Sequence, residues 1–282
     1  MGRIAVVGWD QETNVELVTA WRELGLPAML LSPPEAMGRL EQDDVALGRL
    51  DVAKSLDGVE PGLETLGFLQ HRGVRVLNRA GALMKAHDKL LTAHRLDHAA
   101  VPNPRTVFVP PDATDVLLPA PLVLKPRFGS WGVDVLRCDA EADIAPALEL
   151  LRTRPWFHRQ GAIAQTLIEP RGYDLRLLVA GGVIIGSAER RAAPGEWRTN
   201  VSLGGSRRPV DPPPEAARLG VAAAAAIGTD FVGIDLIPTN GEHIVLELNG
   251  AVEFDRVYDL PGQNVYLDLA CQLDLAPVEV AV

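Results

Sequence analysis

The chain has 282 residues, of which 37 are acidic and 27 are Lys or Arg, so its formal net charge is −10 at neutral pH. This negative balance opposes attraction to nucleic acid or to an anionic membrane surface. The sequence has no basic tail, and none of its apolar runs approaches the roughly 20 residues that a membrane span requires. We therefore expect no nucleic-acid partner and no membrane anchor.

Cys138 and Cys271 lie far apart in the sequence, and neither belongs to a CxxC motif. Two cysteines can form at most one bridge, so a disulfide framework is excluded. Residues 1–8 form a short apolar run that lacks the long hydrophobic region and cleavage site of an export signal. These features predict a protein of the reducing cytoplasm.

The first 78 residues predict a small parallel sheet, because short apolar strands alternate with amphipathic helices. The expected strands cover residues 3–8, 27–31, 44–50 and 74–77, and the expected helices cover 14–24 and 63–72. Gly8 is followed by Trp9 and Asp10, where a GxGxxG fingerprint would place further glycines. A nicotinamide dinucleotide site is therefore not expected in this Rossmann-like N-terminal domain.

Residues 79–159 predict a small α+β lid. A helix at 83–98 ends before Pro102, strands at 122–125 and 133–138 enclose a glycine-containing loop, and a second helix covers 142–151. Residues 160–282 predict a C-terminal antiparallel-sheet domain. Its expected strands cover 162–168, 174–180, 183–187, 231–237 and 243–248, and its helix covers 215–227. The Gly181-Gly182 and Asn240-Gly241 pairs are typical of hairpin turns.

Asp235 and Glu247 each lie within an apolar strand pattern, where an unpaired carboxylate would be costly to bury. A hairpin through Asn240-Gly241 would bring both carboxylates and the side chain of Asn249 to one surface. Oxygen donors of this kind suit Mg²⁺, which completes its coordination with water and phosphate. The alternative is that these acids pair with arginines or line a sheet edge.

Lys125 ends the strand at 122–125 and precedes a loop that contains Ser130 and Gly132. Such a loop can present backbone N–H groups and one positive charge to phosphates, although the lysine precedes the glycines and so does not match a P-loop. The pattern predicts a covering flap. An ordinary hairpin with a flexible tip is the alternative.

The segment 189–209 contains five arginines, which predicts an anionic ligand. Arg190 and Arg198 are the candidates for stabilising charge during group transfer, whereas Arg207 and Arg208 fit a solvated loop. Asp174 alternates with apolar residues on its strand and faces either a cleft or a cross-strand ion pair.

Two further side-chain patterns predict no site. His87, His94 and His98 recur near helical spacing, but neighbouring Lys and Asp residues favour a solvated helix face over a metal site. Ser130 and Ser202 lack the GxSxG elbow of a serine nucleophile.

The order of these motifs along nearly the whole chain resembles the RimK/LysX branch of the ATP-grasp superfamily. The motifs are Asn78, Asp88-Lys89, Pro102-Asn103-Pro104, Lys125-Pro126 with the GSWG loop, Asp174-Leu175-Arg176, Arg190, Asn200 with Gly204-Gly205, GIDLI and ELN. The resemblance implies an ATP-grasp fold that comprises an N-terminal Rossmann-like domain, a central lid and a C-terminal antiparallel-sheet domain.

The resemblance also implies an ATP-dependent carboxylate-amine ligase, in which a carboxylate is phosphorylated and then attacked by an amine. Lys89, Lys125 and the flap at Ser130 and Gly132 would then hold ATP phosphates. The segment Gln165, Thr166, Leu167 and Ile168 would hold adenine, and Asp174 the ribose side. Asp235, Glu247 and Asn249 would bind two Mg²⁺ ions, with Mn²⁺ as the alternative metal. Arg190 and Arg198 would steady the acyl phosphate.

The same resemblance assigns Asn200, Gly204, Gly205 and Glu253 to the substrate pocket. After Asn249 the chain continues with Gly250-Ala251-Val252-Glu253 instead of a nearby Pro, which is closer to LysX-type ligases that use a carrier-protein terminus. The expected partners are an amino acid, such as glutamate, and the carboxylate of a small molecule, peptide or carrier. By analogy we expect a dimer or tetramer. A glutathione-synthetase or D-alanine-ligase type of enzyme, or a catalytically silent ATP-binding module, are the alternatives.

Overall fold

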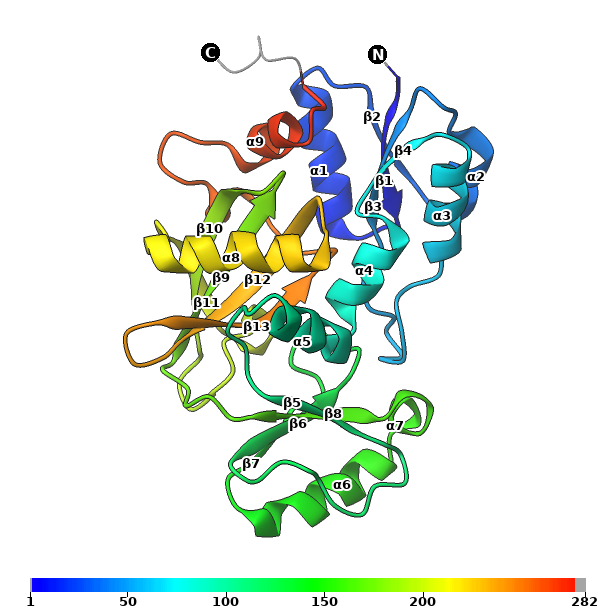
Figure 1. Ribbon diagram of the computed structural model, residues 1–282. Helices are drawn as coiled ribbons and strands as arrows, with labels where there is room; N and C mark the ends of the chain where they lie inside the picture. The colour runs from blue at the N-terminus through cyan, green and yellow to red at the C-terminus, as the bar shows by residue number, and fades with distance from the viewer. Residues whose placement is uncertain (1, 277–282) are drawn as a thin grey trace.

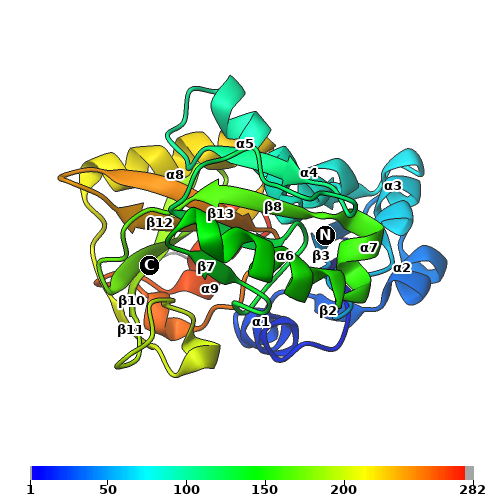
Figure 2. The ribbon, with the colours of Figure 1, turned by 90° about the horizontal axis from the view of Figure 1, so that it is seen from below.

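The computed structural model describes residues 2–276. Over this range the chain forms three β-sheets with helices packed around them, and the N-terminal and C-terminal sheets lie above the central one in the view of Figure 1. Seen from below, the central sheet and its helices cover much of the C-terminal sheet (Figure 2). The expected combination of one parallel and further antiparallel sheets is confirmed.

The N-terminal sheet is parallel and has the strand order β2-β1-β3-β4. Its strands are β1 (Ile4–Gly8), β2 (Ala28–Leu31), β3 (Val45–Arg49) and β4 (Arg75–Leu77), and its helices are α1 (Glu12–Glu23), α2 (Pro33–Arg39) and α3 (Leu63–His71). Every residue of β1 is buried, as expected for a parallel strand that is covered on both faces. Of these elements, α2 is the one that was not predicted from the sequence.

Two helices occupy the segment in which one helix was predicted at 83–98. They are α4 (Ala80–His87) and α5 (Lys89–His98), and Asp88 between them is extended, with φ −83° and ψ 99°. The Asp88 carboxylate accepts hydrogen bonds from the backbone N–H groups of Leu90 and Leu91 and therefore caps α5. The cap places Lys89 in the first turn of α5.

The central sheet is antiparallel and has the order β5-β8-β6-β7. Its strands are β5 (Thr106–Val109), β6 (Leu122–Pro126), β7 (Leu136–Cys138) and β8 (Ala162–Thr166), and it carries the 3₁₀ helix η1 (Glu141–Asp143) and the helices α6 (Ile144–Arg152) and α7 (Pro155–Gln160). The strand expected at 133–138 begins only at Leu136, because the glycine loop continues further than predicted. The elements β5 and α7 were not predicted.

The C-terminal sheet is antiparallel and has the order β11-β10-β9-β12-β13. Its strands are β9 (Tyr173–Ala180), β10 (Val183–Arg191), β11 (Ser206–Pro209), β12 (Phe231–Pro238) and β13 (His243–Asn249). The other elements in this part of the chain are α8 (Pro214–Ile227), α9 (Val265–Gln272) and the 3₁₀ helices η2 (Val201–Leu203) and η3 (Arg256–Tyr258). The hairpin between β12 and β13 is confirmed, with Gly241 at φ +94°.

The domain boundaries 1–78, 79–159 and 160–282 remain proposals. Strand β8 follows the proposed boundary at 159 and is hydrogen-bonded to β5 and β6 of the central sheet. Helix α1 packs against α9, and the Trp21 indole N–H donates a 2.9 Å hydrogen bond to the Tyr266 carbonyl. The two ends of the described chain are thereby joined in one hydrophobic core. Among residues 2–276, no helix is both long and apolar enough to cross a membrane.

Candidate active site

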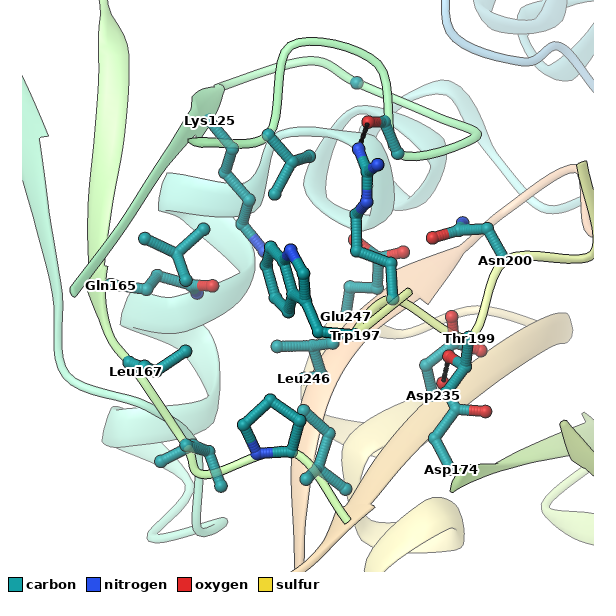
Figure 3. A pocket seen from close by; sticks show the side chains of 18 of the residues that line it. Lys125, Gln165, Leu167, Asp174, Trp197, Thr199, Asn200, Asp235, Leu246 and Glu247 are labelled. Atoms are coloured by element: carbon teal, nitrogen blue, oxygen red, sulfur yellow. Dashed lines mark hydrogen bonds between the residues drawn. The ribbon is translucent and has the colours of Figure 1, made fainter. Parts of the chain in front are cut away.

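A cleft lies between the central and C-terminal sheets (Figure 3). It encloses about 1010 Å³ that protein atoms do not fill, including its open mouth. Most of the side chains that the sequence singled out line it. They are Lys89, Lys125, Ser130, Gly132, Gln165, Thr166, Leu167, Ile168, Asp174, Arg190, Arg198, Asn200, Asp235 and Glu247. Residues that lie far apart in the sequence therefore meet at one place.

Two lysines supply positive charge on the central side of the cleft. Lys125 is buried at the end of β6, and burial lowers its pKa to about 8, although Glu247 opposes this shift. Lys89 Nζ donates a 2.5 Å hydrogen bond to the Gly129 carbonyl and lies 3.4 Å from Glu247 Oε2. The two ammonium groups are thus on the same side of the cleft as the glycine loop, an arrangement suited to a polyphosphate.

A network of ion pairs crosses the C-terminal sheet. Arg190 on β10 forms hydrogen bonds of 2.8 and 2.5 Å to the two oxygens of Asp174 on β9. Arg176 on β9 binds both oxygens of Asp235 on β12 at 2.7 and 2.8 Å. Arg190 Nη2 also lies 2.9 Å from Asp235 Oδ2. The alternative reading of Asp174 and Asp235, as members of cross-strand ion pairs, is therefore confirmed.

The network controls the charge of Asp235. Burial by itself would raise the pKa of this carboxyl, but Arg176 and Arg190 outweigh burial and hold the pKa well below its ordinary range. The pKa of Arg190 is raised well above its ordinary value, because Asp235 and Asp174 outweigh its own burial. Asp235, Arg176 and Arg190 therefore all remain charged at neutral pH.

The strand register places Asp235 and Glu247 in the cleft, and Asn249 lines an adjoining cavity that Glu247 also borders. Asp235 and Glu247 are directly opposite in the β12–β13 pair, and Asn249 is opposite Gly233. Among residues 2–276, no group of three or more His, Cys, Asp or Glu side chains is arranged to hold a metal ion. Any metal here would need the amide oxygen of Asn249 and ligands from phosphate or water.

The chemistry of this donor set fits Mg²⁺ nevertheless. The Glu247 side chain is partly exposed, and its Oε2 forms an ion pair with Lys89 Nζ at 3.4 Å. The amide oxygen of Asn249 is the group that could bind the metal, whereas its buried Nδ2, which has no hydrogen-bond partner within residues 2–276, is a donor suited to a phosphate or water oxygen. Asp235 Oδ2 is contacted by both Arg176 and Arg190, but Oδ1 accepts only from Arg176 Nε and keeps a second acceptor direction.

An irregularity in the sheet adds an apolar wall that sequence alternation did not predict. The β12–β13 register shifts between Asp235 and Leu236, so that Leu246 has no direct partner on β12. Such a bulge reorients neighbouring side chains, and Leu246 and Glu247, adjacent in sequence, both line the cleft. Trp197 also projects into the cleft (Figure 3) and was missed, because it lies in an irregular loop.

The glycine loop is held to the loop that follows β10. Trp131 and Gly132 adopt left-handed backbone conformations, with φ +57° and +72°. Arg198 Nη1 donates a 2.9 Å hydrogen bond to the Gly132 carbonyl, and the Ser202 hydroxyl donates to the Trp131 carbonyl at 3.3 Å. The predicted flap therefore covers the cleft as part of a two-loop lid.

Gly204 and Gly205 do not line this cleft, nor do they line a second cavity that adjoins it and is described below. Gly204 has φ +88°, and a Cβ atom on Gly205 would lie 2.9 Å from the carbonyl oxygens of Arg191, Thr199 and Asn200. The pair lets the loop close tightly on itself, and through that loop it positions Asn200.

The anionic ligand predicted from the arginine-rich segment 189–209 stays a prediction. Each arginine of this segment already contacts a carboxylate. The partners are Asp174 and Asp235 for Arg190, Glu189 for Arg191 and Arg208, Glu196 for Arg198, and Asp255 for Arg207. The segment is neutralised internally because Glu189, Glu196 and Asp255 lie beside it.

The prediction for the histidines is wrong for one of them. His94 and His98 are exposed, as expected, but His87 is buried at the end of α4. A Cβ atom on Gly250 would lie 3.1 Å from His87 Nε2, so the glycine is what leaves room for the ring. Burial lowers the pKa of His87 to about 3, and the ring is neutral.

A second cavity adjoins the cleft and shares Ser130, Arg190 and Glu247 with it. Asn249 and Glu253, two of the predicted site residues, lie on its wall together with Asn200. It also includes Asp51, which sequence reasoning missed. Asp51 follows β3, at the carboxyl end of a parallel strand, where ligands commonly bind. This position in the sequence could have identified Asp51 as a candidate site residue.

Comparison with solved structures agrees with this geometry. A D-alanine–D-alanine ligase from Bacillus anthracis, complexed with ATP, superposes with a TM-score of 0.68 at 15% identity and covers 99% of this chain and 96% of its own. A RimK domain ATP-grasp protein from Sphaerobacter thermophilus gives a TM-score of 0.67 at 21% identity, with coverages of 96% and 99%. At these identities the similarity shows the fold, and the fold is that of an ATP-grasp enzyme.

The sequence comparisons carry the assignment further. A RimK-like ATP-grasp domain matches residues 86–273. A relative described as a probable alpha-L-glutamate ligase from Pseudomonas paraeruginosa is 28% identical over 209 residues, which are 72% of this chain and 68% of the relative. A second relative of the same description, from Legionella pneumophila, is 30% identical over 209 residues, which are again 72% of this chain and 68% of the relative. The chain belongs to the RimK-like ATP-grasp family, and it is an ATP-dependent carboxylate-amine ligase.

Proposed function

We propose that this ligase joins an α-amino acid, with L-glutamate as the first candidate, to the carboxylate of a small molecule or peptide. The observation that carries the proposal is the junction of the two cavities at Arg190 and Glu247. A phosphate held in the cleft would lie next to a carboxylate held in the second cavity. The description of the relatives as glutamate ligases supports the choice of amino acid.

The chain's own residues have distinct tasks in this proposal. Lys89 and Lys125 bind phosphate oxygens, and the flap at Ser130 and Gly132 excludes water from them. The segment from Gln165 to Ile168 holds the adenine edge, and Asp174 lies on the ribose side. Arg190 orients the carboxylate that is to be activated and stabilises the charge that develops during phosphoryl transfer. Arg198, which holds the flap, contributes through that contact.

Glu247 and Asn249, together with Asp235, would hold Mg²⁺, with Mn²⁺ as the alternative ion. When bound, the metal supplies positive charge to the phosphate oxygens. Asn200 and Glu253 contact the substrates in the second cavity, and Gly204 and Gly205 shape the loop that carries Asn200. A small acceptor is favoured over an acidic carrier protein, because the arginine-rich segment that would attract such a carrier is already neutralised.

Trapping with hydroxylamine tests the activation step. Hydroxylamine attacks an acyl phosphate at its carbonyl carbon, forms a C–N bond and releases phosphate, so it reports activation of a carboxylate even when the natural amine is absent. The purified protein with Mg-ATP is offered a panel of amino-acid, peptide and small-molecule carboxylates. We expect at least one to give a hydroxamate together with an equal amount of ADP. Tight ATP binding without hydroxamate from any member of the panel would instead support a silent nucleotide-binding module.

A further inference from the structure

The second cavity is lined by both basic and acidic side chains. Arg176, Arg190 and Arg207 come from strands of the C-terminal sheet, whereas Asp51 follows β3 and Glu253 follows β13. The three arginines are already paired with carboxylates, as described above. Within residues 2–276, neither Asp51 nor Glu253 forms an ion pair with any Lys or Arg.

Hydrogen bonds fix Asp51 in place, but one of its two carboxylate oxygens has no hydrogen-bond partner among residues 2–276. The residue is 8% exposed. Its Oδ1 accepts a 2.7 Å hydrogen bond from the Val52 N–H, and its own N–H donates to Glu60 Oε2 at 2.9 Å. Asp51 Oδ2 accepts no hydrogen bond from the described part of the chain. This oxygen is not fully buried, so a ligand in the cavity can reach it.

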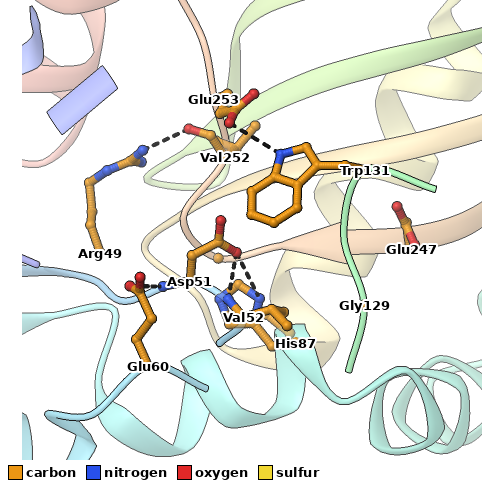
Figure 4. A network of polar contacts seen from close by, with 12 residues as sticks. Arg49, Asp51, Val52, Glu60, His87, Gly129, Trp131, Glu247, Val252 and Glu253 are labelled. Atoms are coloured by element: carbon orange, nitrogen blue, oxygen red, sulfur yellow. Dashed lines mark hydrogen bonds and ion pairs between the residues drawn. The ribbon is translucent and has the colours of Figure 1, made fainter. Parts of the chain in front are cut away.

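The basic groups behind Asp51 do not neutralise it. His87 Nδ1 lies 3.9 Å from Asp51 Oδ1, and the ring is neutral. Arg49 is turned away (Figure 4), since its Nε donates to Asn14 Oδ1 at 2.6 Å and its Nη2 donates to the Val252 carbonyl at 2.7 Å. Burial and the nearby Glu60 and Glu253 raise the pKa of Asp51 to about 6, so the carboxylate is charged at neutral pH.

Trp131 of the flap completes this part of the cavity. Its indole N–H donates a 3.3 Å hydrogen bond to Glu253 Oε1, and the ring lines the cavity beside both carboxylates (Figure 4). Two carboxylates and an aromatic ring form the combination that recognises an organic cation, through ion pairing and attraction to the ring face.

We propose that Asp51, Glu253 and Trp131 form an ammonium subsite, which binds the amino group of the amine substrate while the carboxylate to be activated lies toward Arg190. This inference rests on the proposed ligase function and adds the orientation of its two substrates. A neutral nucleophile such as hydroxylamine does not need the subsite. An amino acid arrives as an ammonium ion, which the subsite binds and which gives up one proton to a carboxylate of the subsite before its nitrogen attacks the acyl phosphate.

The test compares two nucleophiles on one activated carboxylate. With a carboxylate that gives hydroxamate on the wild type, Asp51→Asn and Glu253→Gln are assayed with hydroxylamine and with L-glutamate as the amine. Asp51→Asn keeps an oxygen for the Val52 N–H. Asp44→Asn is the matched control, because Asp44 is a buried carboxylate of the same domain that pairs with Arg3 and lines neither cavity.

We expect Asp51→Asn and Glu253→Gln each to raise the KM for L-glutamate at least tenfold. Hydroxamate formation by Asp51→Asn should stay within about twofold of the wild type, which also shows that this variant is folded. An unchanged KM for L-glutamate, or equal losses with both nucleophiles, would overturn the ammonium subsite. Absence of hydroxamate from the wild type would instead refute the ligase proposal itself, so the two failures are distinguishable.

Discussion

Arg190 Nη2 lies 2.9 Å from Asp235 Oδ2, although their strands β10 and β12 are separated by β9. The contact spans the intervening strand because Arg190 also binds Asp174 on β9, which is opposite it in the register. The ion pair between Arg190 and Asp235 therefore lies where the cleft adjoins the second cavity. Its charges are buried, so its members contribute to folding as well as to the site.

Replacing Asp235 by Asn should destabilise the protein strongly. The change leaves the buried Arg176 and Arg190 guanidinium groups without one of their carboxylate partners, and breaking a buried ion pair in this way typically costs about 3–5 kcal/mol. Chemical denaturation should show the loss in the free energy of unfolding. A stability equal to that of the wild type would mean that the network does not support the fold.

Replacing Glu247 by Gln should separate catalysis from folding. The Glu247 side chain is partly exposed, and its ion-pair partner, Lys89, is also at the cleft. We expect a loss of ADP release of about a hundredfold or more, with a change in unfolding free energy below about 1 kcal/mol. Turnover is measured beside thermal denaturation. An unfolded E247Q protein would indicate a structural role instead.

ATP binding should weaken as the pH rises through about 8. Burial lowers the pKa of Lys125 to about 8, so the free enzyme loses this ammonium group above that pH, and phosphate binding must then restore the proton. The Kd for Mg-ATP, measured by calorimetry, should rise by roughly tenfold between pH 7 and 9. The K125M variant is the control, and its weaker affinity should be less dependent on pH over this range. Identical pH profiles for the two proteins would contradict the role of Lys125.

Replacing Asp51 by Asn should stabilise the free protein above pH 6. Because the folded-state pKa of Asp51 is raised from 3.8 to about 6, the folded protein binds its proton more tightly, and this group lowers stability as the pH rises from about 4 to 6. A shift of roughly two pKa units corresponds to about 3 kcal/mol at most. Thermal denaturation at pH 8 should show D51N as the more stable protein, with little difference at pH 4. A destabilised variant at pH 8 would show that Asp51 supports the fold.

Much of the site could be predicted because its residues lie on regular strands. The apolar patterns around Asp235 and Glu247, joined by Asn240-Gly241, fixed a hairpin in which the two carboxylates are opposite each other. The lysine at the end of β6 and the glycines after it likewise predicted the flap. Local pattern was sufficient wherever one hairpin brought the residues together.

The remaining features depend on contacts between distant segments, or on an irregularity within the β12–β13 hairpin that alternation does not encode. Asp88 interrupts a helical pattern because its carboxylate caps α5 and binds Arg127, which is 39 residues away. The bulge at Leu246 breaks the alternation on which the strand-face argument relied. Asp51 belongs to no motif, and it becomes a site residue only where the N-terminal sheet meets Glu253. None of these is encoded in the periodicity of one segment.

In this ligase, ATP cleavage is expected to be coupled to amide formation. The most direct measurement is ADP release by the purified protein with Mg-ATP over a matrix of amino acids, L-glutamate included, and acceptor carboxylates, with mass spectrometry of every active pair. We predict a pair-dependent release of ADP and one new product, whose mass equals that of the two substrates less one water. ADP release that no pair stimulates, or that yields no condensed product, would contradict the account.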